Sequence, residues 1–259
     1  MNGEIINKVK YPSPNPAIQL WVVTYVSDHL KVKGLLAEPV ASGCYDGLLY
    51  LRGGIKNVGM VRIGRIVQFA SEGFVVMAPF YRGNQGGEGN EDFAGDDRYD
   101  AISAIGLLKR HPKVNPDRIH LFGFSRGGVM ALLAGLLAEN IRSVVTWGGV
   151  SDMFLTYDER EDLRRMMKRV IGGTPTKVPE RYMWRTPLYE LEKMTAPVLI
   201  IHGVKDKNVS VEHSYRLEKR LKELNKEVES WYFKEFTHYF PPKTNRETLH
   251  RLCTWMKKQ

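Results

Sequence analysis

The stretch HLFGFSRGGVMALLAGLLA, residues 120–138, sets the architecture of this chain. It begins as an apolar strand, breaks at Gly123 and continues as an apolar run of helical period, with Ser125 placed between Gly123 and Gly127. Glycines two residues before and two after a serine are what a very tight strand-to-helix turn requires, because side chains there would collide with the neighbouring backbone. On such a turn the serine hydroxyl stands clear of the sheet, at the amino end of the next helix.

Ser125 has two roles open to it. Serine before a helix is commonly an N-cap, followed by glycines that only allow close packing. A hydroxyl beside the unpaired N–H groups of a helix end is also well placed to act as a nucleophile. Partners elsewhere in the chain decide between these roles.

Short apolar runs alternate with longer stretches of helical period along the chain. We predict strands at residues 20–26, 31–37, 48–51, 74–78, 118–122, 143–146, 197–201 and 229–233, and helices at 61–70, 98–109, 129–139, 213–224 and 244–256. The first two strands are expected to form a hairpin through Asp28 and His29. The alternation from residue 48 onward predicts an α/β fold with a mostly parallel sheet of about eight strands and helices on both faces.

The segment 151–193 interrupts this alternation between the sixth and seventh predicted strands. It is rich in charged and aromatic residues, as in RRMMKRVIGGTPTKVPERYMWR. We expect it to form a small helical cap inserted into one domain that spans residues 1–259.

Two later segments supply partners for Ser125. VLIIHGVKDKNVS places Asp206 at the carboxyl end of an apolar strand, and WYFKEFTHYF places His238 in a loop after another strand. Each has an ordinary alternative, as a turn aspartate and as a histidine packed in an aromatic loop. Serine, aspartate and histidine in this chain order at strand ends are typical of the triad on an α/β-hydrolase sheet. Asp152 is a reserve candidate for the acid, although a cap position fits it better.

The predicted strand LLYL, residues 48–51, is followed by Arg52-Gly53-Gly54. On an α/β-hydrolase sheet, a turn at this point of the chain supplies an N–H group to the oxyanion hole. The N–H groups of Gly53 and of Arg126, the residue after the nucleophile, are the predicted donors to the oxyanion. Two glycines after a strand also occur as a plain turn, but their place in the chain favours the functional role.

At these residues the sequence resembles the α/β-hydrolase superfamily, and within it the catalytic domain of the prolyl oligopeptidase family and related dienelactone-hydrolase-like esterases. The resemblance runs from about residue 20 to the C-terminus and includes PFYRGNQGGEG, DDRYDAISAIGLLKRHPKVNPDRIHLFGFSRGG and HGVKDKNV. The family often has histidine where Arg52 stands and tyrosine where Arg126 stands. Its peptidase members usually carry a β-propeller ahead of this domain, for which 259 residues leave no room.

These observations predict a serine hydrolase that forms an acyl-enzyme on Ser125, with His238 as base and Asp206 orienting it. Carboxylic esters or lactones of small size are the first expected substrates, and short peptides or aminoacyl amides are the alternative. A hydrolase fold that only binds a ligand is the alternative of another class. No metal or organic cofactor is expected.

Three arginines stand beside the predicted site. Arg52 and Arg126 flank the oxyanion donors, and Arg82 follows a neighbouring strand. They would suit the carboxylate of an anionic substrate, since a guanidinium holds a carboxylate through two parallel hydrogen bonds. The commoner role for such arginines is to brace loops by pairing with nearby acids, here Glu88, Glu91, Asp96 and Asp97.

The composition is that of an ordinary globular protein, with 43% hydrophobic and 26% charged residues. The net charge is +9, but positive and negative residues are interspersed and no nucleic-acid-binding motif occurs, so we expect no nucleic-acid partner. No apolar run is long enough for a membrane span, and no signal peptide is evident, which predicts a cytoplasmic protein with Cys44 and Cys253 as free thiols. The sequence gives no indication of oligomeric state.

Overall fold

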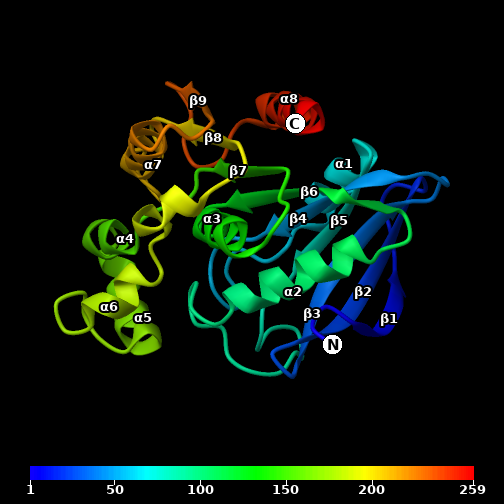
Figure 1. The fold of residues 1–259 in the computed structure, drawn as a ribbon, viewed down its shortest axis with the longest axis horizontal. Helices are drawn as coiled ribbons and strands as arrows, with labels where there is room; N and C mark the ends of the chain where they lie inside the picture. Colours follow the sequence, from blue (N-terminus) through cyan, green and yellow to red (C-terminus); the bar gives the residue numbers. More distant parts are fainter.

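The computed structural model describes all 259 residues and is built on one nine-stranded sheet (Figure 1). The strand order is β1-β2-β3-β5-β4-β6-β7-β8-β9. The strands are β1 (Ile5–Tyr11), β2 (Ile18–Ser27), β3 (Leu30–Pro39), β4 (Tyr45–Leu51), β5 (Phe74–Pro79), β6 (Val114–Phe124), β7 (Ser143–Trp147), β8 (Val198–Gly203) and β9 (Val228–Phe233). The first three and the β3–β5 pair run antiparallel, and all pairs from β5 to β9 are parallel. The predicted α/β fold is therefore confirmed.

One strand of the sheet was not predicted. The sequence indicated about eight strands, and the ninth is β1, an edge strand that pairs only with β2. It is short and polar at Asn7, Lys8 and Lys10, and none of its residues is fully buried, so it lacks the buried face that the other strands have. The strand carries Lys8 and Lys10. Lysine is common on edge strands, where its charge discourages pairing with other chains.

The hairpin between β2 and β3 turns as predicted at Asp28 and His29. Both residues have positive φ, 47° and 66°, and Ser27 pairs with Leu30 across the turn. A two-residue turn with positive φ at both positions follows the twist of the strands it joins.

Helices cover both faces of the sheet (Figure 1). One apolar core lies against α2 (Arg98–Lys109), α3 (Gly127–Leu137) and α7 (Glu212–Glu223). The other lies against α1 (Ile63–Ser71) and α8 (Pro242–Lys258). Alternate residues of β4 enter the two cores, because successive side chains of a strand point to opposite faces.

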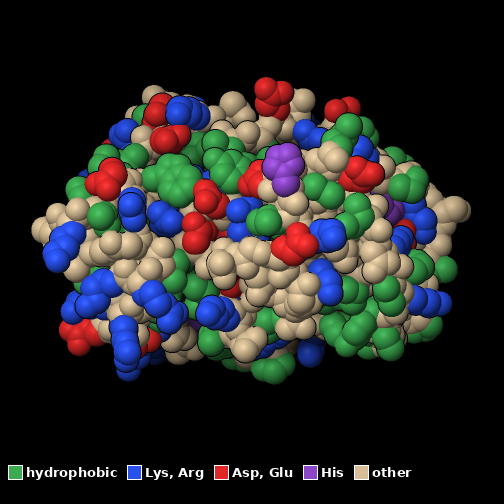
Figure 2. Space-filling view, turned by 90° about the horizontal axis from the view of Figure 1, so that it is seen from below, with side chains coloured by type: hydrophobic (Ala, Val, Ile, Leu, Met, Phe, Trp, Pro, Cys, Tyr) green, Lys and Arg blue, Asp and Glu red, His purple; other side chains and the backbone are tan.

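Between β7 and β8 the chain forms α4 (Met153–Glu159), α5 (Glu161–Ile171) and α6 (Pro179–Met183), followed by two short 3₁₀ turns, Pro187–Tyr189 and Leu191–Lys193. These helices lie at the opposite end of the molecule from β1 (Figure 1). Lysine and arginine side chains gather at this end, while elsewhere on the same face both signs are mixed (Figure 2). No helix in the chain combines the length and the apolar character that a membrane crossing needs.

The turn between β6 and α3 is as tight as its glycines require. A Cβ on Gly123 would lie 2.0 Å from the carbonyl oxygen of Gly127, and a Cβ on Gly127 would lie 2.0 Å from that of Leu51. Ser125, at the tip, has φ of +57°, a conformation that costs a serine free energy. The close approach of β4, β6 and α3 holds it there.

A buried group of charges ties three loops together beneath this turn. Glu91, from the loop after β5, accepts hydrogen bonds from Arg52 Nη2 at 3.2 Å and from Arg126 Nη2 at 2.5 Å, and all three side chains are at most 2% exposed. Arg126 also contacts Asp97 at 3.3 Å. Burial raises the pKa of Asp97 to about 7, against the opposing effect of Arg126. At neutral pH Glu91 is therefore the main counterion of both arginines.

We expect Gly127→Ala to destabilise the protein by about 2 kcal/mol or more, because the added methyl would overlap the backbone of β4. The measurement is the free energy of unfolding from urea titration. Gly64→Ala is the matched control, since a Cβ on Gly64 has no atom within 4 Å and alanine favours a helix. Equal stability of the two variants would contradict the steric argument.

Glu91→Gln should cost about 3–5 kcal/mol of unfolding free energy, because it leaves two buried guanidinium groups without their shared counterion. Glu88→Gln, in the same loop, is the control. Glu88 is 49% exposed in its ion pair with Lys31, so its loss should cost less than about 1 kcal/mol. Thermal melts of both variants, beside the wild type, measure the difference.

Candidate active site

Ser125, His238, Gly53 and Arg126 line one cavity of about 660 Å³ at the carboxyl end of the parallel strands. Ser125 reaches it from the turn after β6, Gly53 from the loop after β4 and His238 from the loop between β9 and α8. A Cβ on Gly53 would lie 2.7 Å from Ser125 Cβ, so only glycine lets the backbone of this loop come so close to the serine. Residues predicted from separate parts of the sequence thus share one cavity.

Asp206 lies behind His238, away from the cavity. Its Oδ2 is 2.6 Å from His238 Nδ1, and its Oδ1 accepts hydrogen bonds from the N–H groups of Asn208 and Val209 at 2.8 and 3.0 Å. Burial alone raises the pKa of Asp206, but hydrogen bonds with His202 and His238 and the charge of His238 hold it well below its usual range. The carboxylate is therefore ionised at neutral pH, beside the imidazole.

His202 and Gly148 support this pair and were not singled out in the sequence. His202 Nε2 is 3.4 Å from Asp206 Oδ2, and its Nδ1 is 2.6 Å from Ser214 Oγ. Gly148 has φ of +53°, and a Cβ there would lie 3.2 Å from His238 Nδ1. His202 stands inside the quoted IIHGVKD motif, but nothing in the sequence indicates that it faces the aspartate four residues later.

Asp152 does not take part. Its Oδ1 accepts hydrogen bonds from the N–H groups of Phe154 and Leu155, and its Oδ2 pairs with Arg216 at 3.0 Å. It is the N-cap of α4, the alternative role that the sequence offered it.

The backbone N–H groups of Gly53 and Arg126 donate no hydrogen bond to any protein acceptor. Both residues line the cavity beside Ser125. Free N–H groups next to a hydroxyl are able to bind the oxygen of a polarised carbonyl.

The prediction that Arg52 and Arg82 bind substrate does not fit their positions. Neither lines the cavity. Arg52 is held by Glu91, and Arg82 pairs with Asp100 at 2.9 Å and with Asp28 at 3.0 Å. The guanidinium of Arg126 is buried as well, stacked 4.7 Å from the ring centre of Tyr81. Buried arginines need acid partners, and these loops supply them. Of the acids predicted for this role, Glu91 and Asp97 pair with the arginines. Glu88 pairs with Lys31 instead, and Asp96 makes no ion pair.

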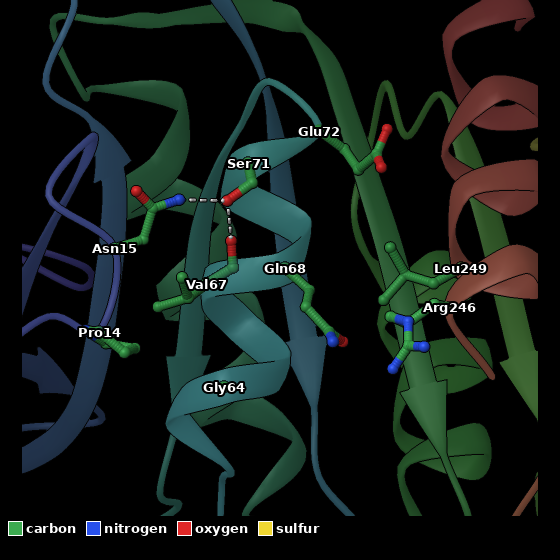
Figure 3. Close-up of a pocket in the computed structure, with 9 residues that line it drawn as sticks. All are labelled: Pro14, Asn15, Gly64, Val67, Gln68, Ser71, Glu72, Arg246 and Leu249. Atoms are coloured by element: carbon green, nitrogen blue, oxygen red, sulfur yellow. Dashed lines mark hydrogen bonds between the residues drawn. The ribbon is translucent and has the colours of Figure 1, made fainter. Parts of the chain in front are cut away.

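A second pocket lies between α1 and α8, away from Ser125 (Figure 3). It contains a serine, Ser71, which hydrogen bonds to Asn15 Nδ2 and to the carbonyl oxygen of Val67. No histidine lines this pocket. Ser71 therefore has no base beside it and is a helix residue that bonds its own backbone.

The family model described as "Prolyl oligopeptidase family" matches residues 61–259. The chain is 64% identical over 256 residues to the "Uncharacterized peptidase YtmA" of Bacillus subtilis, an alignment that covers 98% of this chain and 100% of that protein. Among solved structures, a puromycin-hydrolyzing peptidase of Mycobacterium tuberculosis superposes with a TM-score of 0.83 at 21% identity, over 95% of this chain and 40% of that one. Acetyl xylan esterase 1 of Thermoanaerobacterium gives 0.75 at 14% identity, over 97% and 88%.

Both solved structures share the fold at low identity, whereas the family match and the Bacillus relative extend over most of the chain. The resemblance inferred from the GFSRGG turn and the motifs around it is confirmed. The chain belongs to the prolyl oligopeptidase family and is a serine hydrolase of the peptidase and esterase class.

Proposed function

We propose that this protein hydrolyses acyl bonds of small substrates, carboxylic esters first, with Ser125, His238 and Asp206 as its triad. The observation that carries the proposal is the shared cavity. A serine in a strained turn, a histidine oriented by a buried carboxylate and two unpaired N–H groups all meet there.

In this mechanism Ser125 Oγ attacks the carbonyl carbon while its proton passes to His238 Nε2. Asp206 keeps the other ring nitrogen, Nδ1, protonated and stabilises the imidazolium. The N–H groups of Gly53 and Arg126 hold the oxyanion, and the leaving group departs with the proton of His238. Water, activated by His238, then attacks the acyl-enzyme, which releases the acid and restores Ser125.

Hydrolysis of short peptides or aminoacyl amides is the second candidate activity. The Bacillus relative, 64% identical, bears the name of a peptidase, and the same triad attacks esters and amides. Amides have the poorer leaving group and depend more on protonation by His238. A panel of p-nitrophenyl esters, lactones and aminoacyl anilides, assayed on one preparation, ranks the two activities by kcat/KM.

Ser125→Ala should lower kcat on a p-nitrophenyl ester by about 10⁴-fold or more, because triad members act as a unit. Ser71→Ala is the control, since it removes a serine hydroxyl from the other pocket and should leave kcat unchanged. A fluorophosphonate probe should label the wild type and not the Ser125 variant. Unchanged turnover by Ser125→Ala would refute the mechanism, and a wild type that resists labelling would favour a binding protein without catalysis.

Asp206→Asn should lower kcat by about 10⁴-fold, because an amide cannot hold the required tautomer of His238 or stabilise its charge. Asp152→Asn keeps the helix cap and loses only the pair with Arg216, so kcat should stay within about twofold of wild type. Circular dichroism checks that both variants fold. A larger loss for Asp152→Asn would show that the acid is misassigned.

A further inference from the structure

The charged lining of the catalytic cavity is entirely positive. Four arginines line it, and no aspartate or glutamate does. Two of the four have acid partners: Arg126 contacts Glu91 and Asp97, and Arg160 contacts Asp162 at 2.7 Å. The other two, Arg62 and Arg65, have no carboxylate within ion-pair distance.

Arg62 and Arg65 come from the start of α1, and both contact the segment that follows His238 in the chain. The Arg62 guanidinium is 5.5 Å from the ring centre of Tyr239, the residue after His238. Arg62 is exposed, and its guanidinium makes no hydrogen bond within the chain. Arg65 donates to Asn245 Oδ1 at 2.7 Å, and its guanidinium lies 5.2 Å from the centre of the Trp147 ring. Neutral partners hold Arg65 in place but leave its charge uncompensated.

These two charges repel one another across one turn of helix. Burial and the neighbouring Arg62 lower the pKa of Arg65, against the opposing effect of Tyr50. An anion placed between the guanidinium groups would relieve this repulsion and gain hydrogen bonds from both.

The opposite side of the cavity has another character. Val150, Leu163 from α5 and Val209 line it together with the polar Thr156 and Asn208, and its one charged residue, Arg160, is paired with Asp162. Figure 1 shows α1 and the group α4–α6 well apart, on either side of the central strands. Unpaired positive charge therefore lies only on the α1 side of the cavity, which suits an anionic group there.

Resting on the proposed function, we infer that the natural substrate carries a carboxylate in its leaving portion, bound by Arg62 and Arg65. The leaving atom must face His238, which returns the proton to it. A chain that passes His238 toward Tyr239 arrives at Arg62. The acyl portion then occupies the opposite side near Val150 and Leu163.

The test compares 4-(butyryloxy)benzoate with its methyl ester, which have the same acyl group and differ in one negative charge on the leaving group. The measured quantity is the ratio of their kcat/KM values. We expect Arg62→Gln and Arg65→Gln each to lower this ratio, and the double variant to lower it about tenfold or more, with the methyl ester nearly unaffected. The wild-type ratio should fall with added NaCl, and that of the double variant should not.

Arg220→Gln is the matched control, because it removes the same charge from α7 outside the cavity. Its ratio should equal that of wild type. A similar fall in Arg220→Gln, equal losses on both esters, or a fall confined to an ester with the acid in its acyl group, such as mono-4-nitrophenyl adipate, would each overturn the inference.

Binding of the product separates this inference from the proposed function. In the Ser125→Ala background, calorimetry with 4-hydroxybenzoate should show about tenfold weaker binding once Arg62 and Arg65 are both replaced by glutamine. Weakened binding in a protein whose wild type turns over no ester would refute the proposed function and keep the anion site. Unchanged binding would refute the anion site, whatever the catalytic result.

Discussion

One buried carboxylate holds the catalytic end of this molecule together. Glu91 binds Arg52, which precedes Gly53, and Arg126, which follows Ser125, so the loops that carry both proposed oxyanion donors share one counterion. It also accepts hydrogen bonds from the Lys56 N–H and from Asn84 Nδ2. Burial alone raises the pKa of Glu91, but the charges of Arg126 and Arg52 hold it below its usual value. Positioning of the donors thus depends on electrostatics inside the protein, away from the substrate.

The arginines that stand next to a predicted oxyanion donor or strand end in the sequence are not the ones whose charge stays unpaired in the cavity. Buried guanidinium groups require acid partners. Internal carboxylates pair with Arg52, Arg82 and Arg126. Arg62 and Arg65 adjoin no predicted site residue in the sequence, yet they line the cavity without acid partners. Only an arginine without an acid partner inside the protein has its charge free for a ligand, and these ion pairs form only in the folded chain.

The solved structures compared with this chain share its fold at 21% and 14% identity. In this chain the segment between β7 and β8 contributes Thr156, Arg160 and Leu163 to the cavity wall. The opposite wall comes from α1 and the start of α8. The proposed catalytic groups follow strand ends, which the sheet holds rigidly, whereas much of the cavity wall belongs to helices whose placement depends on packing.

The sequence by itself determined the α/β class, the hairpin at Asp28 and His29, and the turn at Ser125, because these follow from local periodicity and from backbone conformations that only certain residues tolerate. It also predicted Ser125, Asp206 and His238 as partners from their order in the chain. Only the tertiary structure decided that β1 joins the sheet, that Asp152 caps a helix, and that Arg62 and Arg65 face the cavity. The pairing of an exposed edge strand, an ion pair and an unpaired charge all depend on residues distant in sequence, so the local sequence pattern does not indicate them.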